Sequence, residues 1–213
     1  MRTTRTSLLT GLLTTLLAAI MTLGLVDRQA LAADKLAADK HAGAKVSLPL
    51  VIYSDGHGQS GYIPAGWMGT ASAIKYDGSS TTHPRKGNSN CLKIQFTSSS
   101  GWGGIAWQNP ANNWGDNSGG FNLTGAKKLT FWARSKKAGQ VVNFGFGLIG
   151  SDKKYHDTAK GKLKVTLTTH WKHYSISLKG KNLKRIVVGF FWTGAAVDGK
   201  PFTFYLDKIE YQK

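Results

Sequence analysis

From residue 48 onward, apolar and polar residues alternate in short runs, which is the pattern of β-strands with one buried face. In one run, Leu92, Ile94 and Phe96 are separated by Lys93 and Gln95. The pattern predicts nine strands, at residues 51–53, 92–96, 102–108, 129–134, 142–148, 163–167, 174–178, 186–192 and 202–211. Turn-forming residues such as Asp77-Gly78 separate them, and no segment keeps helical spacing for the length of a helix. This spacing predicts an all-β fold, a two-sheet antiparallel β-sandwich, for which the jelly roll is the commonest form at this size.

The first 47 residues contain no aromatic residue and are of a different kind. Arg2 and Arg5 precede an apolar run over residues 8–26, and Ala30-Leu31-Ala32 forms a small-x-small site. This layout predicts a cleaved signal peptide at 1–32 and a secreted or periplasmic protein, with an uncleaved membrane anchor as the alternative. The following stretch is rich in Ala and Lys, and the sequence LAADK occurs twice in tandem at 31–40. Because such a stretch cannot bury enough apolar surface to fold alone, we predict a tether at 33–47 and a folded domain at 48–213.

The chain is strongly basic. Its 213 residues include 28 Lys and Arg against 11 Asp and Glu, a formal net charge of +17, and loss of residues 1–32 would leave +15. Many of the lysines stand at predicted turns, so one interpretation is a solvated rim that keeps the protein soluble. The other is attraction to an anionic polymer such as an acidic polysaccharide. Because export makes nucleic acid an incidental partner, we expect no specific nucleic-acid binding. We also expect the protein to be a monomer.

Cysteine and histidine limit the metal chemistry. Cys91 is the only cysteine, which excludes a disulfide within the chain and a cysteine-based zinc site. Its place in a predicted strand indicates a small core residue, with a reactive thiol as the alternative. His170 and His173 are three residues apart on an extended segment, and this spacing does not aim both rings at one point. We therefore predict that they are surface histidines.

The strand faces that point away from the predicted core carry aromatic, amide and guanidinium groups with glycines between them. Placed together on one sheet face, they would line a groove in which rings stack on sugars and polar groups bond to hydroxyls. The predicted carbohydrate-binding residues are Trp102, Gln108, Trp132, Arg134 and Asn143 on strands and Tyr62, Trp67, Asn112, Asn113 and Trp114 on loops. For Trp102 and Trp132, burial in the core remains the alternative. Trp107 and Trp192 stand beside core positions and are predicted to be buried.

Three segments resemble the strands of galactose-binding-like jelly-roll domains found among the carbohydrate-binding modules of secreted glycoside hydrolases. They are residues 101–108, residues 120–134 with the strand LTFWAR, and residues 204–211. The resemblance implies a non-catalytic sugar-binding β-sandwich that often carries a structural calcium. It also implies that Asp207, in the Leu-Asp pair of the last strand, is a calcium ligand. Lys208 stands where those relatives often have a second acid, and the first-strand region offers only Asp55.

Catalytic signals are few. Glu210 is the only glutamate, and the aspartates stand mostly in turns, so no pair of carboxylates for glycoside hydrolysis is indicated. The best enzymatic alternative is a polysaccharide lyase that would use Tyr155, His156, Arg134 and Asn143. A structural or adhesive cell-envelope protein is a third possibility. The sequence favours a secreted, non-catalytic protein that binds a polysaccharide or oligosaccharide.

Overall fold

The computed structural model describes residues 43–213, so the predicted signal peptide and most of the predicted tether lie outside the described residues. The structure contains twelve strands and one short 3-10 helix, η1 (Ala71–Ala73). The strands are β1 (Leu50–Ser54), β2 (His57–Gly58), β3 (Ile63–Gly69), β4 (Ile74–Ser80), β5 (Cys91–Phe96), β6 (Trp102–Gln108), β7 (Lys128–Ser135), β8 (Val141–Phe146), β9 (Gly161–Thr166), β10 (Lys172–Ser177), β11 (Val188–Ala195) and β12 (Phe202–Gln212). Within residues 43–213 no helix is long and apolar enough to cross a membrane.

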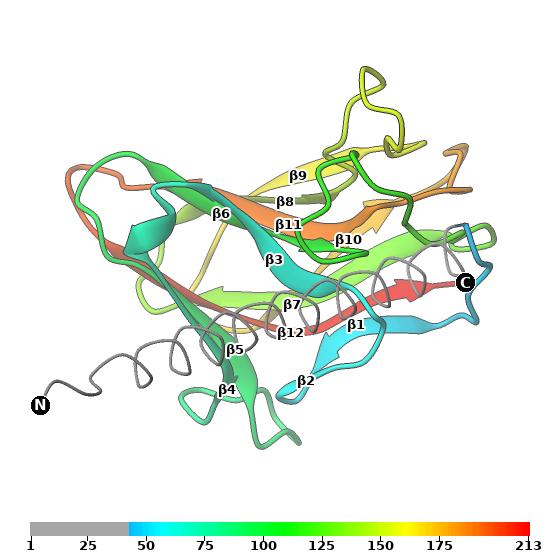
Figure 1. Ribbon diagram of the computed structural model, residues 1–213. Helices are drawn as coiled ribbons and strands as arrows, with labels where there is room; N and C mark the ends of the chain where they lie inside the picture. The colour runs from blue at the N-terminus through cyan, green and yellow to red at the C-terminus, as the bar shows by residue number, and fades with distance from the viewer. Residues whose placement is uncertain (1–42) are drawn as a thin grey trace, which may run out of the picture. The chain divides into compact units, whose positions relative to one another are not determined.

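The strands form two antiparallel sheets, which Figure 1 shows as stacked layers, with β3 and β6 above β7 and β12. One sheet has five strands in the order β3-β6-β11-β8-β9. The other has seven, in the order β10-β7-β12-β1-β2, with β5 also paired to β12 and β4 to β5. Successive strands such as β6, β7 and β8 pass from one sheet to the other. The predicted two-sheet antiparallel β-sandwich is confirmed.

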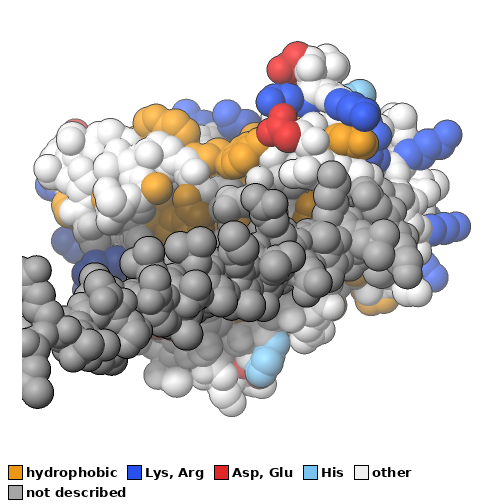
Figure 2. All heavy atoms as spheres, in the orientation of Figure 1, with side chains coloured by type: hydrophobic (Ala, Val, Ile, Leu, Met, Phe, Trp, Pro, Cys, Tyr) orange, Lys and Arg blue, Asp and Glu red, His pale blue; other side chains and the backbone are white. Residues whose placement is uncertain are grey.

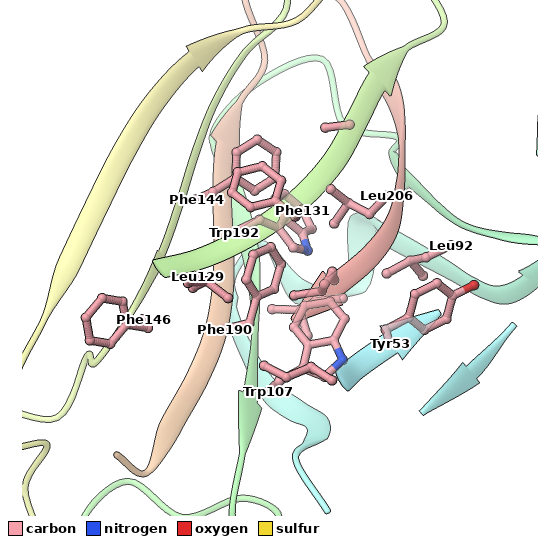
Figure 3. Close-up of a cluster of buried hydrophobic side chains, with 14 of the residues drawn as sticks. Tyr53, Leu92, Trp107, Leu129, Phe131, Phe144, Phe146, Phe190, Trp192 and Leu206 are labelled. Carbon is pink, nitrogen blue, oxygen red and sulfur yellow. The ribbon is translucent and has the colours of Figure 1, made fainter. Parts of the chain in front are cut away.

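The core lies between the two sheets, where the alternating apolar residues meet (Figure 3). Phe131 of β7 contacts Phe144 of β8 and Phe190 of β11, with ring centroids 4.7 and 5.5 Å apart. Trp107 and Trp192 are buried in the same cluster, as their neighbours in the sequence predict. These contacts join the sheets, so the outward faces of the strands remain as the surfaces available for binding.

All nine predicted strands are present, but three further strands, β2, β3 and β4, are not among them. β3 contains Pro64 and two glycines and is an edge strand with a bulge between Pro64 and Gly66, so it shows no regular alternation. In β4 the predicted turn Asp77-Gly78 lies inside the strand, at an irregularity in its pairing with β5. Residues 58–69, predicted as a loop, are thus largely an edge strand.

The folded domain begins earlier than predicted. The Gly43 N–H donates to the Gly120 carbonyl (2.8 Å), and the Val46 N–H donates to the Asn122 carbonyl (3.2 Å). Lys45 also forms an isolated parallel bridge with Asn122. The predicted boundary at residue 48 is therefore wrong, because backbone hydrogen bonds attach this segment to the domain even though its side chains are small and polar.

Cys91 of β5 is fully buried, as predicted, and its thiol donates to the carbonyl of Thr82 (3.3 Å). Burial raises the pKa of Cys91 to about 12, so almost none of it is thiolate at neutral pH. We expect Cys91 to resist a thiol reagent such as Ellman's reagent at pH 8 until a denaturant is added. Stoichiometric reaction of the native protein within minutes would show instead that β5 opens readily.

Candidate functional site

The outer face of the five-stranded sheet gathers more of the predicted sugar-binding residues than any other surface in residues 43–213. Two rows of register partners cross all five strands. From β3 to β9, the first row is Gly66, Ala106, Phe191, Gly145 and Lys162, and the second is Met68, Gly104, Thr193, Asn143 and Lys164. We call this surface, with Trp102 and Trp114 at its two ends, the five-stranded face. Figure 2 shows hydrophobic side chains at the surface over the upper layer of Figure 1.

Glycines in the middle of the five-stranded face make room for the protein's own side chains. A Cβ on Gly145 would lie 2.3 Å from the Gly161 carbonyl oxygen and 2.5 Å from the ring of Phe191. One on Gly104 would lie 2.5 Å from the Trp192 carbonyl oxygen and 3.0 Å from Cε of Met68. These glycines therefore do not leave the backbone open to a ligand. Phe191 and Thr193 of β11 lie at the centre of the five-stranded face, because both side chains point outward from the sheet.

Trp102 forms one end of the face. It is the first residue of β6, its side chain points to the same side as Ala106, and it is 48% exposed. The ring lies against Gly69 of β3, whose Cβ would come within 2.9 Å of it. This contact supports one edge of the indole, and nearly half of the side chain remains open to solvent. The core alternative for Trp102 is thus excluded.

Trp114 stands at the other end, on the loop after β6. It is half-buried and packs against a small apolar cluster that includes Phe191 and Val188. Asn113 holds this loop together, because its Oδ1 accepts hydrogen bonds from the N–H groups of Gly115 (3.0 Å) and Asn117 (3.1 Å). Asn113 is 1% exposed and stabilises the loop from within. Asn112 is exposed at the tip of the loop.

Gln108 is at the end of β6 and is fully buried. Its Nε2 donates to the carbonyl of Asn113 (3.0 Å), which fixes the loop to the strand. Its Oε1 is buried without a hydrogen-bond partner within residues 43–213. Direct sugar contact by Gln108, as predicted from its outward position, is therefore not available in this arrangement.

Asp157 anchors a second loop beside Trp114. Its carboxylate accepts hydrogen bonds from the N–H groups of Val187 (2.5 Å), Val188 (3.1 Å) and Ile149 (2.8 Å). Burial raises the pKa of Asp157 and outweighs these three bonds, which lower it. An ion pair between Lys153 and Asp116 (2.9 Å) ties this loop to the loop of Trp114.

Trp132 and Arg134 do not belong to the five-stranded face. They lie on β7, on the outer face of the seven-stranded sheet, where Arg85 covers the ring of Trp132 at 5.4 Å and Arg134 lies 5.8 Å from the ring of Tyr205. Their placement with Trp102 and Asn143 on one sheet face is wrong, because the strand order that separates them is set by long-range pairing.

Tyr62 and Trp67 also fail as members of the site. Tyr62 is 3% exposed, and its hydroxyl donates to the carbonyl of Ile186 (2.7 Å). Trp67 is 42% exposed but pairs with the core residue Ile105, so its side chain leaves β3 on the inner side, where it meets Tyr76 at the open edge of the sandwich. Trp67 is therefore an exposed tryptophan outside the five-stranded face.

The residues considered for a lyase are not assembled into one centre. Asn143 lies on the five-stranded face and Arg134 on the opposite side of the sandwich. Tyr155 and His156 belong to the loop held by Asp157, and Nδ1 of His156 is 3.1 Å from the Lys153 carbonyl oxygen. Because Arg134 and Asn143 are on opposite surfaces, the four groups cannot act on one substrate bond.

Asp207 and Asp55 do not fit a calcium ion. The Oδ2 of Asp207 accepts hydrogen bonds from Nε of Arg85 (3.1 Å) and Nδ2 of Asn88 (2.6 Å), and its Oδ1 accepts from the N–H of Lys208 (2.8 Å) and of Asp55 (3.1 Å). Asp55 in turn accepts two backbone hydrogen bonds. Within residues 43–213 no group of three or more His, Cys, Asp or Glu could hold a metal. Arg85 supplies the positive charge at this site, so the arrangement of Asp207 and Asp55 does not fit the expected calcium ligands.

Several residues of the site were not predicted from the sequence. Met68 lies on the strand that was taken for a loop, and Asp157 is one acid in a lysine-rich segment with no local signal. Thr193 could have been found, because it continues the alternation of Gly189 and Phe191 beyond the predicted end of that strand.

The fold has counterparts among solved structures, although no family model and no curated protein matches the chain. It is similar to a family 30 carbohydrate-binding module of a cellulosomal cellulase of Clostridium thermocellum, with a TM-score of 0.55 and 17% identity over 77% of this chain and 96% of that one. It is also similar to a family 11 carbohydrate-binding module of another cellulosomal cellulase of that organism, with a TM-score of 0.51 and 13% identity over 78% and 96% of the two chains. A family 11 module from the same organism, solved in complex with a β-1,3-1,4-mixed-linked tetrasaccharide, has a TM-score of 0.50 and 13% identity over 78% and 97%. At these identities the similarity establishes a β-sandwich of the type found in carbohydrate-binding modules.

Proposed function

We propose that this protein is a secreted, non-catalytic glycan-binding protein whose ligand lies across the five-stranded face between Trp102 and Trp114. The observation that carries the proposal is Trp102, a tryptophan that is 48% exposed on a sheet face beside small and polar residues. A flat indole matches the C–H surface of a pyranose ring, and its position at the end of the face leaves the rest of a chain free to extend over the sheet.

Polar groups beside Trp102 support a carbohydrate rather than a purely apolar ligand. Asn143 and Thr193 are register partners in the middle of the second row, and both remain partly exposed. Their amide and hydroxyl groups can bond to sugar hydroxyls that would otherwise lose water contacts. Lys162 and Lys164 are the exposed ends of the two rows at β9, which favours a glycan with negative charges along that edge.

The comparisons support this proposal at the level of the fold. The similar structures are named as binding modules, and one family 11 module is solved with an oligosaccharide. The separation of Arg134 from Asn143 counts against the lyase alternative. Secretion rests on the layout of residues 1–32, and N-terminal sequencing of the exported protein would test the cleavage.

The direct test is retention on immobilised polysaccharides, beginning with a broad glycan array to identify a ligand. Trp102→Ala is expected to weaken binding by at least about fivefold, because a stacked aromatic ring contributes on the order of 1–3 kcal/mol. The melting temperature should change little, since the ring is half exposed. Affinity electrophoresis or calorimetry with the identified glycan measures the loss.

Trp67→Ala is the matched control. Trp67 is 42% exposed on the neighbouring strand of the same sheet but points to the other side, so its removal should leave binding unchanged. Equal losses from the two variants would overturn the assignment to the five-stranded face. Absence of binding to every glycan of the array would favour the cell-envelope alternative, and unsaturated, ultraviolet-absorbing products would favour a lyase.

A further inference from the structure

A cavity of about 410 Å³ opens at the end of the sandwich where β5, β7 and β11 finish and β12 begins. The loop between β7 and β8 forms one wall and the loop between β11 and β12 forms another. No sequence pattern pointed to this place, and none of the predicted sugar-binding residues lines it.

The backbone of the walls is held by hydrogen bonds. The Lys136 N–H donates to the Thr203 carbonyl (2.9 Å), and the Gly139 N–H donates to the Leu167 carbonyl (3.0 Å). Nε2 of Gln140 donates to the carbonyls of Val141 (3.0 Å) and Ala195 (3.3 Å), which joins one loop to the end of β11. A cavity with fixed walls loses little free energy to ordering when a ligand enters.

The lining is positively charged. Lys136, Lys137 and Lys200 line the cavity with a single acid, Asp198. Within residues 43–213 none of these four side chains takes part in an ion pair. Three ammonium groups are therefore available to an anion, while Asp198 can accept hydrogen bonds from hydroxyl groups.

The lining also has an apolar part and neutral polar groups. Phe202 is stacked on Phe96 with a centroid distance of 5.3 Å, and Val197 at the rim is 50% exposed. Gln95 and Gln140 are both partly exposed beside them. An inorganic anion would leave the apolar surface unused, and a neutral sugar would leave the ammonium groups unused.

We propose that this cavity is a second binding site, for a sugar residue that carries a carboxylate, such as a uronic acid. The lysines take the carboxylate, the amides and Asp198 take the hydroxyls, and Phe202 with Val197 faces the C–H surface of the ring. The volume suits a ligand of one to three sugar residues. The site is separate from the five-stranded face, so it can be present or absent independently of the function proposed above.

Calorimetry with trigalacturonate, and with maltotriose as a neutral trisaccharide, tests the site at physiological salt. We expect trigalacturonate to bind and maltotriose to bind at least tenfold more weakly, because charge-assisted hydrogen bonds contribute on the order of 1.5–3 kcal/mol each. The triple variant K136Q/K137Q/K200Q should lose at least about tenfold in affinity. All three lysines are exposed, so its melting temperature should match that of the wild type.

The triple variant K127Q/K179Q/K184Q is the control, with the same change in net charge. These exposed lysines stand at the other end of β7, β10 and β12, on the order of 30 Å away along strands of this length, well beyond the Debye length of about 8 Å. It should lose less than about threefold in affinity. Backbone amides of residues 136–140 and 196–203 should show the NMR shifts on titration.

Equal losses from the two triple variants would overturn the proposal, since the protein would then respond only to overall charge. Equal affinity for inorganic phosphate and trigalacturonate would overturn the assignment to a sugar, as would no binding of trigalacturonate by the wild type. Trp102→Ala should leave trigalacturonate binding intact. Loss of binding in that variant alone would move the acidic ligand to the five-stranded face.

Discussion

Replacing Arg85 with methionine is expected to lower the free energy of unfolding by about 3 kcal/mol. Asp207 has no exposed side-chain surface, and Arg85 is its ion-pair partner, with Nε 3.1 Å from Oδ2. Methionine keeps much of the length of the side chain but leaves the carboxylate buried with neutral donors only. The low end of the range for buried pairs applies because Arg85 keeps 22% exposure. Urea unfolding followed by tryptophan fluorescence measures the change.

Arg134→Met provides the comparison on the same sheet face. Arg134 is half-buried over Tyr205, its Nε has no hydrogen-bond partner within residues 43–213, and no carboxylate pairs with it there. Its removal should cost less than about 1 kcal/mol, the size of a cation–π contact. Similar losses from Arg85→Met and Arg134→Met would show that packing, rather than the charge on Asp207, explains the effect.

A chelator tests whether Arg85 or a metal ion neutralises the carboxylate of Asp207. If Arg85 supplies the charge, the melting temperature of the wild type should not change when EDTA is added or when calcium is supplied in excess. A clear drop in melting temperature with EDTA, together with an Arg85→Met variant as stable as the wild type, would show that Asp207 binds a metal ion.

The fold was largely predictable because its signal is local. Nine strands carry a regular alternation that comes from one face being buried, and runs such as 92–96 show it without reference to any other part of the chain. β3 and β4 were missed because an edge strand tolerates Pro64, glycines and bulges, so burial imposes less of a pattern on it.

The site was less predictable because it depends on strand order. The outward positions of Trp102, Asn143 and Trp132 were all visible in the alternation, but whether two strands share a sheet is decided by pairing between distant residues. The glycines could not be interpreted either, since the atoms that a Cβ on Gly104 or Gly145 would meet belong to other strands. Arg85 and Asp207 are 122 residues apart, and nothing local connects them.

Replacing Asp157 with alanine is expected to destabilise the protein by about 3 kcal/mol and to weaken glycan binding on the five-stranded face. The variant leaves the N–H groups of Ile149, Val187 and Val188 buried without an acceptor, and each such group costs on the order of 1–3 kcal/mol. Relief from burying the carboxylate offsets part of that sum. Because the loop held by Asp157 packs beside Trp114, its release should loosen one end of the face.

Asp152→Ala serves as the control, since Asp152 is an exposed acid of the same loop and should change neither stability nor binding. If Asp157→Ala is destabilised but binds the glycan as tightly as the wild type, the Trp114 end of the face is not part of the site.

The pH dependence of the destabilisation by Asp157→Ala identifies its physical cause. Burial raises the pKa of Asp157 above its ordinary value of 3.8, so the folded protein holds this proton more tightly than the unfolded chain. The stabilisation from Asp157 is therefore greatest below pH 3.8. It decreases as the pH rises through the raised pKa of Asp157 in the folded protein, and above that pKa it is constant. The difference in unfolding free energy between the wild type and Asp157→Ala, measured by urea unfolding at successive pH values, should shrink across that window. A difference that grows with pH would mean that the three N–H groups outweigh burial, and that the loop is held by an ionised carboxylate of lowered pKa.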